Sequence, residues 1–383
     1  MRIAFVLGST PPRHDRADDL QDLVENHGDW LGDEARAVAA LGHEVSIHLI
    51  YSRAGTASHD GVDWFFHPPL IGFSPLRGGK EYCPALNASL RDWAPDLIHY
   101  QIISHAFNYA YCARTARTLG VPLVGQHHGD PISPFFWNNA ALRWAARRSA
   151  AIVFLTRFHR DLYCERLGIE RGRTAVIPVG YNEYFHRRDR AACRAKTGLD
   201  GDPVFFWAAM LNKRKDPLLL LRAFRAVSER FPEARLYMAG SGPIEEEVKH
   251  LLAADVTLSR SVKLLGYVDN RDLPDYLNAA DVYVMASHWE GFAISSMEAM
   301  ACGAVPVLTR IPCFVEQTDN GKLGLLFEAG DQKDLEEKLM RAAGDRPWRD
   351  TVRNALCAHI APFTWRASAQ KLERLYSSLL SGR

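Results

Sequence analysis

Residues 282–303 are V-Y-V-M-A-S-H-W-E-G-F-A-I-S-S-M-E-A-M-A-C-G, and they predict a strand, a loop and a helix in succession. Val282–Met285 is a continuous run of apolar residues, as expected of a strand buried on both faces. We expect the helix to open at about Ala293, with Glu290 just before it and Glu298 about two turns inside. Such a unit belongs to a parallel α/β sheet, in which ligands bind beyond the carboxyl ends of the strands.

Similar short apolar runs alternate with amphipathic helical stretches along most of the chain. The first series comprises Ile3–Leu7, Glu44–Ile50, Leu97–Tyr100, Pro122–Gly125 and Ala151–Leu155, and the second comprises Val204–Ala208, Arg235–Ala239, Val262–Leu265, Val282–Met285 and Val305–Leu308. Between them, residues 186–203 are charged and poor in large apolar side chains, which is typical of a linker followed by a helix. The pattern predicts two doubly wound α/β domains, residues 1–186 and 187–363, and a final helix within residues 364–383.

Composition and charge narrow the class of protein. The chain has 383 residues, of which 47% are apolar, with 46 Lys and Arg against 45 Asp and Glu. This composition argues against disorder, and the charge balance offers no bulk attraction to nucleic acid. No stretch approaches the roughly 18–20 apolar residues that span a bilayer. The seven cysteines form no C-x-x-C pair, so we expect reduced thiols and a cytoplasmic protein.

The quoted stretch also carries a candidate anion site. The amides of Gly291, Phe292, Ala293 and Ile294 are the unpaired N–H groups of the expected helix start, and they can bind a phosphate. Glu298 inside the helix could accept two hydrogen bonds from a ribose diol. The alternative is a helix-capping neighbour, Glu290, and a solvated Glu298. Small apolar residues beside Glu298 favour a buried helix, where a carboxylate needs a partner.

These residues resemble the E-x(7)-E signature of retaining glycosyltransferases of family 4, and further motifs agree in order and separation. They are G-H-E-V at 42–45, P-D-L-I-H at 95–99, P-V-G-Y-N at 178–182 where P-N-G-V-D is usual, A-G-S-G-P at 239–243, and F-T-W at 363–365. The resemblance covers nearly the whole chain.

This resemblance implies a GT-B fold, with two Rossmann-like domains facing across a cleft and the last helix crossing back to the first domain. Residues 1–186 with 364–383 would bind the acceptor, and residues 187–363 would bind a nucleotide-sugar donor. Glu298 would hold the ribose, Glu290 would contact the donor sugar as a catalytic residue, and Gly291–Ile294 would meet the sugar or diphosphate. The implied reaction is retaining transfer of a sugar to an acceptor hydroxyl, with front-face attack and no protein nucleophile.

A basic cluster, Lys213-Arg214-Lys215, follows the strand Val204–Ala208. Cations here would stabilise the charge that grows on a leaving diphosphate. The family pattern is G-R-L-x-x-x-K, so Lys215 matches the family lysine and is predicted to be catalytic. The family arginine is replaced by Met210. Either Lys213 or Arg214 supplies the second charge, or stabilisation of the leaving group is weaker.

The first domain offers a histidine and a glycine. H-H-G-D at 127–130 follows a strand, and His128 is the better match to the family histidine near the donor sugar, while His127 is expected to be structural. The usual G-G pair is reduced to Gly28, which could still let the backbone approach the diphosphate or the acceptor. The polar insert 8–25 is either a lid or a disordered loop. Aromatic residues 135–137 could form an acceptor-binding lip, touch a membrane surface or simply pack.

We therefore expect a glycosyltransferase with a nucleotide-diphosphate sugar as co-substrate and no cofactor or metal, since the D-G-D at 200–202 lies in the expected linker and is interpreted as a turn. We expect the acceptor to be a saccharide, a lipid-linked saccharide or a small natural product, and the alternative to a free cytoplasmic location is peripheral contact with the inner face of a membrane. The rivals are a GT-B epimerase or hydrolase on the same donor, and a nucleotide-sugar-binding protein without activity. The base, the sugar, the acceptor and the oligomeric state are not readable from the sequence.

Overall fold

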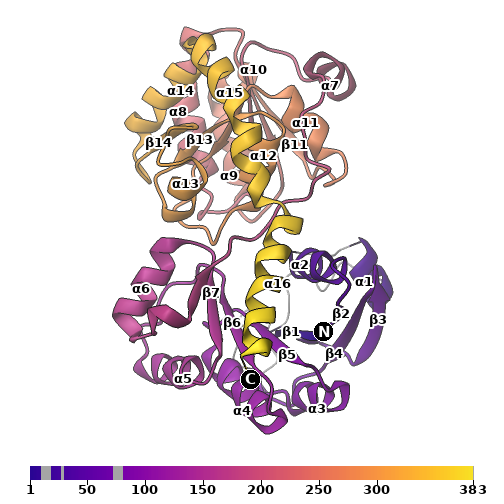
Figure 1. Ribbon diagram of the computed structural model, residues 1–383. Helices are drawn as coiled ribbons and strands as arrows, with labels where there is room; N and C mark the ends of the chain where they lie inside the picture. The colour runs from indigo at the N-terminus through magenta and orange to yellow at the C-terminus, as the bar shows by residue number, and fades with distance from the viewer. Residues whose placement is uncertain (10–18, 27–29, 72–80, 383) are drawn as a thin grey trace. The chain divides into compact units, whose positions relative to one another are not determined.

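The computed structural model describes residues 1–9, 19–26, 30–71 and 81–382 (Figure 1). The chain divides into two compact units. Unit 1 comprises Met1–Gly180 together with Trp365–Arg383, and unit 2 comprises Tyr181–Thr364. Each unit is an α/β structure built on a mostly parallel sheet, as the alternation of strands and helices predicted.

Unit 1 contains an eight-stranded sheet in the order β3-β4-β2-β1-β5-β6-β7-β8. Its strands are β1 (Arg2–Leu7), β2 (Glu44–Ile50), β3 (Gly55–His59), β4 (Val62–His67), β5 (Leu97–Gln101), β6 (Leu123–His127), β7 (Ala151–Phe154) and β8 (Thr174–Val176). All neighbours are parallel except the edge pair β3 and β4. The strand order reverses between β1 and β5, which is the position where open α/β sheets leave room for a ligand.

Helices cover both faces of this sheet. They are α1 (Leu20–Asn26), α2 (Trp30–Ala39), α3 (Pro84–Trp93), α4 (Ala106–Leu119), α5 (Phe136–Ala146), α6 (Arg157–Leu167), the short 3-10 helix η1 (Arg171–Arg173) and α16 (Trp365–Ser381). Strand β1 shows the alternation, because Ala4 and Val6 belong to one buried cluster and Phe5 and Leu7 to another. The last helix joins the second cluster through Leu372 and its neighbours, so α16 belongs to unit 1 as expected.

Unit 2 contains a six-stranded parallel sheet in the order β11-β10-β9-β12-β13-β14. Its strands are β9 (Val204–Ala208), β10 (Arg235–Ala239), β11 (Val262–Gly266), β12 (Val282–Met285), β13 (Val305–Thr309) and β14 (Leu325–Phe327). Its helices are α7 (Arg190–Thr197), α8 (Pro217–Arg230), α9 (Glu245–Ala254), α10 (Val256–Ser261), α11 (Leu273–Ala279), α12 (Ile294–Ala301), α13 (Pro312–Gln317), α14 (Gln332–Gly344), α15 (Arg346–Ile360) and the 3-10 helix η2 (Ala361–Phe363).

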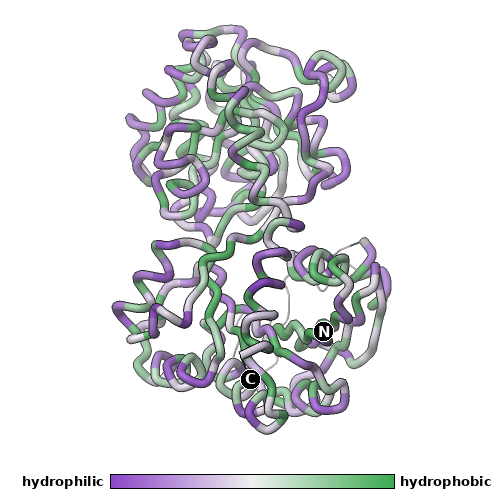
Figure 2. The backbone as a smooth tube through the Cα atoms, in the orientation of Figure 1, coloured by the Kyte–Doolittle hydropathy of each residue, from purple (hydrophilic) through white to green (hydrophobic). Residues whose placement is uncertain are grey.

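The hydrophobic stretches gather inside each unit, while hydrophilic stretches occupy the outer helices and turns (Figure 2). Strands β9, β12 and β13 are completely buried along their length, which explains their unbroken apolar sequences. Within the described residues, no helix is both long and apolar enough to pass through a bilayer.

The segment 186–203, predicted to be a linker followed by a helix, contains α7, whose Asp189 side chain caps the helix by accepting a hydrogen bond from the amide of Ala192. Strands β3, β4, β8 and β14 were not predicted. β8 and β14 have three residues each, and β3 is a polar edge strand, so none of these carries the long apolar signal of a central strand.

Candidate active site

The predicted donor loops lie side by side in unit 2. Strands β9 and β12 are hydrogen-bonded neighbours, and the strand order reverses between them. The segment 209–216 follows β9, and the segment 286–293 follows β12. Because parallel strands end at the same edge, both loops occur at the topological switch point of this sheet.

Glu290 joins these two loops through its carboxylate. Lys215 Nζ donates to Glu290 Oε1 at 2.5 Å, and Arg214 Nη1 donates to Glu290 Oε2 at 2.9 Å. The Glu290 side chain is only 7% exposed. Arg214 also donates to the carbonyl of Trp289 at 2.9 Å. Two cations on one carboxylate leave an excess of positive charge, as an anion-binding site requires.

Two features of its environment act on the pKa of Lys215 in opposite directions. Burial lowers the pKa of Lys215, and the charge of Glu290 and its hydrogen bond act in the opposite direction. A buried ammonium and a buried carboxylate each lose hydration, and their contact offsets this cost.

The loop after β9 is held in position by backbone and side-chain contacts. Asp216 begins α8, accepting a hydrogen bond from the amide of Leu219 at 3.1 Å, and its other oxygen contacts His288 Nε2 at 2.9 Å. The amide of His288 donates to the carbonyl of Arg214 at 2.9 Å. The two loops therefore form one connected structure, although 75 residues separate Lys215 from Glu290.

The glycines of the 239–243 motif also support the loop after β9. A Cβ atom on Gly240 would lie 1.9 Å from the carbonyl oxygen of Ala209, and one on Gly242 would lie 2.3 Å from that of Leu211. Because side chains at these two positions would collide with backbone, the motif requires glycine for packing against the segment that leads to Lys215.

Helix α12 begins at Ile294, one residue after the predicted position. Ala293 before it has a left-handed backbone with φ 52°, a conformation that L-residues other than Gly rarely adopt. Gln317, at the end of α13, stabilises this turn: its side chain donates to the carbonyl of Phe292 and accepts from Ser296 Oγ at 2.5 Å. Gln317 was missed by the sequence analysis, because a lone glutamine in an amphipathic stretch carries no signal.

Glu298 lies half-buried on α12, close enough to Tyr283 of β12 for its charge to act on the phenol. Burial raises the pKa of Tyr283, and the charges of Glu298 and Glu290 add to this effect. The Tyr283 hydroxyl donates to Ser295 Oγ at 3.0 Å. The two carboxylates of the motif thus act on the same buried phenol from opposite ends of the turn.

Two residues of the basic loop face solvent. Lys213 is exposed, and it forms no ion pair with any described residue. Met210, at the family arginine position, is 55% exposed. Of the two candidate replacements, only Arg214 contacts Glu290.

In unit 1, His128 follows β6 and is held by a buried polar network. His128 Nε2 lies 2.6 Å from Gln101 Oε1, and its ring packs on Trp30 with centroids 4.2 Å apart. Gln101 Nε2 donates to Glu34 at 3.1 Å. Burial lowers the pKa of His128 well below its usual range, and nearby histidines add to this effect, so the ring is neutral.

The remaining predicted positions have structural roles or lie outside the described residues. His127 is fully buried, and its Nε2 contacts the carbonyl of Asp130 at 2.9 Å. Gly28 lies outside the described part of the chain, as do residues 10–18 of the polar insert 8–25. The later part of this insert belongs to α1, which begins at Leu20. Asp200 of the D-G-D sequence accepts a hydrogen bond from the Tyr237 hydroxyl.

Comparison with known proteins gives two family matches that together cover most of the chain. Residues 31–183 match the profile described as Glycosyltransferase Family 4, and residues 189–356 match Glycosyl transferases group 1. The chain is 32% identical over 216 residues to D-inositol 3-phosphate glycosyltransferase of Corynebacterium jeikeium, covering 53% of this chain and 51% of the relative. It is 30% identical over 234 residues to mannosylfructose-phosphate synthase of Agrobacterium fabrum, covering 58% and 51%. The chain thus spans about half the length of these curated relatives.

Solved structures show the same fold at low sequence identity. Sucrose-phosphate synthase from Thermosynechococcus elongatus superimposes with a TM-score of 0.76 at 20% identity, over all of both chains. Anabaena HepE in complex with UDP gives a TM-score of 0.76 at 20% identity, over 99% of this chain and 100% of the other. These structures share the GT-B fold with this chain, and the two profile matches show that the chain belongs to glycosyltransferase family 4.

Proposed function

We propose that this protein is a retaining glycosyltransferase that moves a sugar from a nucleotide-diphosphate sugar to an acceptor hydroxyl without a metal ion. The anomeric carbon loses its bond to the diphosphate and gains one to the acceptor oxygen on the same face. The acceptor proton passes to the leaving phosphate, so no protein nucleophile is required.

The observation that carries this proposal is the contact of Lys215 and Arg214 with Glu290 beside the start of α12. The two side chains bring positive charge to the loop that leads into the N-terminus of α12, where the helix dipole also favours an anion. In the proposed reaction, these groups stabilise the charge that grows on the departing diphosphate. Glu290 holds both cations in place and contacts the donor sugar.

The other site residues take supporting roles. Glu298 binds the ribose, the amides of Gly291–Ile294 meet the sugar or diphosphate, and Lys213 adds long-range attraction for the anionic donor. His128 binds a hydroxyl of the transferred sugar. Anabaena HepE was solved with UDP-glucose, so uridine diphosphate sugars are the first donors to test.

Thermal-shift screening against UDP, GDP, ADP and dTDP sugars identifies the donor, because a ligand at 100 times its Kd adds about 2.7 kcal/mol to stability. NMR analysis of the product with a matched acceptor then tests retention, and addition of EDTA tests metal independence. An inverted anomer contradicts the retaining mechanism. Donor consumption without an acceptor indicates a hydrolase or an epimerase. Binding without turnover for every acceptor leaves only the nucleotide-sugar-binding protein.

A further inference from the structure

A buried chain of hydrogen bonds connects α2 with His128 in unit 1. Gln101 ends β5 and pairs in register with Gln126 on β6, so their side chains lie next to each other on one face of the sheet. The Glu34 carboxylate on α2 accepts a hydrogen bond from each amide: Gln101 Nε2 donates to Oε2 at 3.1 Å, and Gln126 Nε2 donates to Oε1 at 3.2 Å. Glu34, Gln101 and Gln126 are each at most 1% exposed.

The chemistry of these groups determines the direction of each hydrogen bond. At pH 8, above its raised pKa of about 7, the Glu34 carboxylate is ionised and can only accept, so the amide nitrogen of Gln101 must face it. The amide oxygen of Gln101 is thereby directed to His128 Nε2, 2.6 Å away, and an amide oxygen can only accept. His128 Nε2 must then carry the proton. In a neutral imidazole, Nδ1 is left with a lone pair.

We propose that Glu34 and Gln101 are positioning residues that hold His128 in its Nε2-protonated tautomer, so that Nδ1 is the atom left to accept a hydrogen bond from a sugar hydroxyl. This inference rests on the proposed role of His128 in sugar binding. A histidine free to exchange tautomers would present Nδ1 as a donor in part of the molecules, and it would lose the preorganisation that catalysis requires.

Gln126 provides a matched control. It binds the same carboxylate at nearly the same distance and is equally buried. Among the described residues, no hydrogen bond joins Gln126 to His128; the His128 ring contacts Gln101 instead. Gln126→Leu and Gln101→Leu therefore each remove one hydrogen bond to the Glu34 carboxylate, but only Gln101→Leu removes the acceptor of His128.

The tautomer can be measured by NMR on the full chain labelled with ¹⁵N-histidine, with the His128 signals identified in a His128→Gln variant. At pH 8 we expect protonated Nε2 and unprotonated Nδ1 in the native protein and in Gln126→Leu, and mixed tautomers in Gln101→Leu. A native His128 protonated on Nδ1, or an equal change in both leucine variants, overturns the proposal. If Gln101→Leu does not fold, Glu34→Gln substitutes for it, because a carboxamide has only one acceptor oxygen and we expect it to mix the tautomers as well.

Kinetics separate this inference from the proposed function. We expect Gln101→Leu to lower kcat by roughly 10- to 100-fold with unchanged affinity for the nucleotide diphosphate, because misplacement of one group costs this much without touching the donor site. Full turnover in His128→Ala contradicts the sugar-binding role of His128 but leaves the tautomer measurement valid. Full turnover in Gln101→Leu, together with reduced turnover in His128→Ala, contradicts the positioning role.

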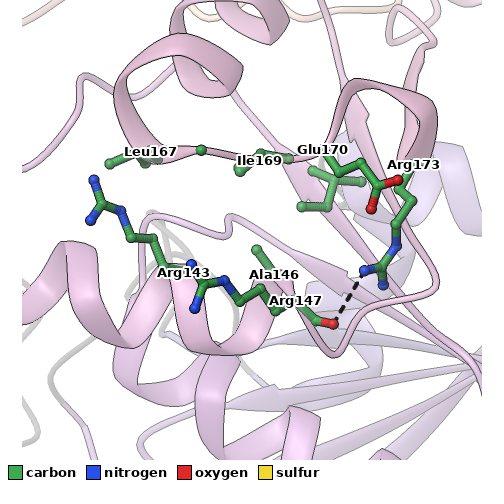
Figure 3. Close-up of a pocket in the computed structure, with 9 residues that line it drawn as sticks. Arg143, Ala146, Arg147, Leu167, Ile169, Glu170 and Arg173 are labelled. Carbon is green, nitrogen blue, oxygen red and sulfur yellow. Dashed lines mark hydrogen bonds between the residues drawn. The ribbon is translucent and has the colours of Figure 1, made fainter.

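A second, independent feature is a recess of about 160 Å³ between the ends of α5 and α6 (Figure 3). This is roughly ten times the 10–15 Å³ that a single water needs. Its wall includes Ile152, Leu167 and Ile169, all buried apolar residues. It lies by the start of β7 and of β8, which is the opposite edge of the sheet from His128 at the end of β6.

Three arginines line this recess: Arg143, Arg147 and Arg173. Arg143 donates to the carbonyl of Arg166 at 3.0 Å, and Arg173 donates to that of Arg147 at 3.2 Å, as the dashed line in Figure 3 shows. Within the described part of the chain, none of the three forms an ion pair with a carboxylate. Glu170 also lines the recess, but residues 136–173 contain eight arginines against three acidic residues, so positive charge stays in excess.

We infer that this recess binds a phosphate group, with the apolar wall receiving the carbon chain attached to it. Guanidinium groups bind phosphate oxygens in pairs, which Lys does less specifically. Such a ligand is either a soluble phosphate ester or the headgroup of an anionic lipid.

Arg148 allows a matched test. It follows Arg147 on the same exposed surface, but its guanidinium stacks on Trp144 at 3.9 Å and does not line the recess. We expect inorganic phosphate to bind the native protein and Arg148→Gln equally in ³¹P NMR titrations, and to bind Arg147→Gln at least tenfold more weakly. If the protein sediments with phosphatidylglycerol vesicles but not with phosphatidylcholine vesicles, the ligand is the headgroup of an anionic lipid. Equal loss in both arginine variants, or no binding of either phosphate or anionic vesicles, overturns the inference.

Discussion

Glu290 in unit 2 and Glu34 in unit 1 are both buried carboxylates that accept two hydrogen bonds, but their donors differ. Glu290 is held by the ammonium of Lys215 and the guanidinium of Arg214, whereas Glu34 is held by two neutral amides. Burial raises the pKa of Glu34 to about 7, and the two amides only partly oppose this rise. Charged donors therefore make a buried carboxylate part of an anion site, whereas neutral donors leave it with a pKa close to physiological pH.

The largest effect is expected where the charged pair is broken. Lys215→Met leaves Glu290 buried with one cation, so we expect a loss of about 3–5 kcal/mol in the free energy of unfolding. We also expect turnover to fall by roughly 100- to 1,000-fold, because one donor to the leaving group is removed. Denaturant titration and steady-state kinetics measure the two losses.

The double variant Lys215→Met/Glu290→Gln sharpens this test. Removing both charges should restore most of the stability without restoring turnover, because the buried charge is gone but so is the anion site. Equal stability of the single and double variants would show that the pair is not what stabilises these loops.

The second effect concerns Glu34 and its dependence on pH. The folded protein keeps the Glu34 proton up to about pH 7, whereas the unfolded chain releases it near 4.5. Folding thus takes up a proton between these values, and stability from this group is full below pH 4.5 and lost as the pH rises through about 7. We expect native stability to fall by about 3 kcal/mol over this interval relative to Glu34→Gln. Denaturation at pH 5, 6, 7 and 8 measures this difference.

Glu44 is the control for this pH dependence. It forms an exposed pair with Arg2 in the same sheet, so Glu44→Gln should follow the native curve. If the stability of Glu34→Gln changes with pH in the same way as that of the native protein, neutral donors are sufficient to keep a buried carboxylate charged.

A smaller effect is expected at Gln317, which supports the turn at the start of α12 without any charge. Gln317→Leu removes its bonds to Phe292 and Ser296, so we expect a loss of about 1–3 kcal/mol of stability. Because the left-handed turn at Ala293 then loses its support, nucleotide affinity should fall as well, as measured by calorimetry with the diphosphate. Unchanged affinity would show that the turn is held by its backbone alone.

The smallest effect separates the two exposed cations of the basic loop. Arg214→Ala should lower turnover by roughly tenfold through loss of a contact with Glu290. Lys213→Ala should change it less than about twofold, because a solvated charge contributes little. Kinetics at 20 and 200 mM salt test the difference, since only the Lys213 effect should disappear at high salt. A larger loss at Lys213 would reverse the assignment of the second cation.

Much of the architecture could be predicted from local sequence. The central strands appear as unbroken apolar runs because helices cover both faces of each sheet, and α12 begins within one residue of the expected position. Strands such as β3 and β14 were missed because short or edge strands lack that pattern. The roles assigned to Glu290, Glu298, Lys215 and His128 stay predictions, while the structure locates each of them at the end of a sheet strand or on the helix that follows.

The sequence by itself determined the class of fold and the residue types of the donor loops, because strand and helix periodicity and the E-x(7)-E spacing are local properties. Only the tertiary structure decided which groups meet. The Lys215–Glu290 contact depends on β9 and β12 being neighbours, and the Glu34–Gln101–His128 chain depends on the fold bringing Glu34 of α2 to the side chains at the ends of β5 and β6. Such contacts join residues far apart in the chain, so their geometry and the shift in the Glu34 pKa arise from burial that no local pattern records.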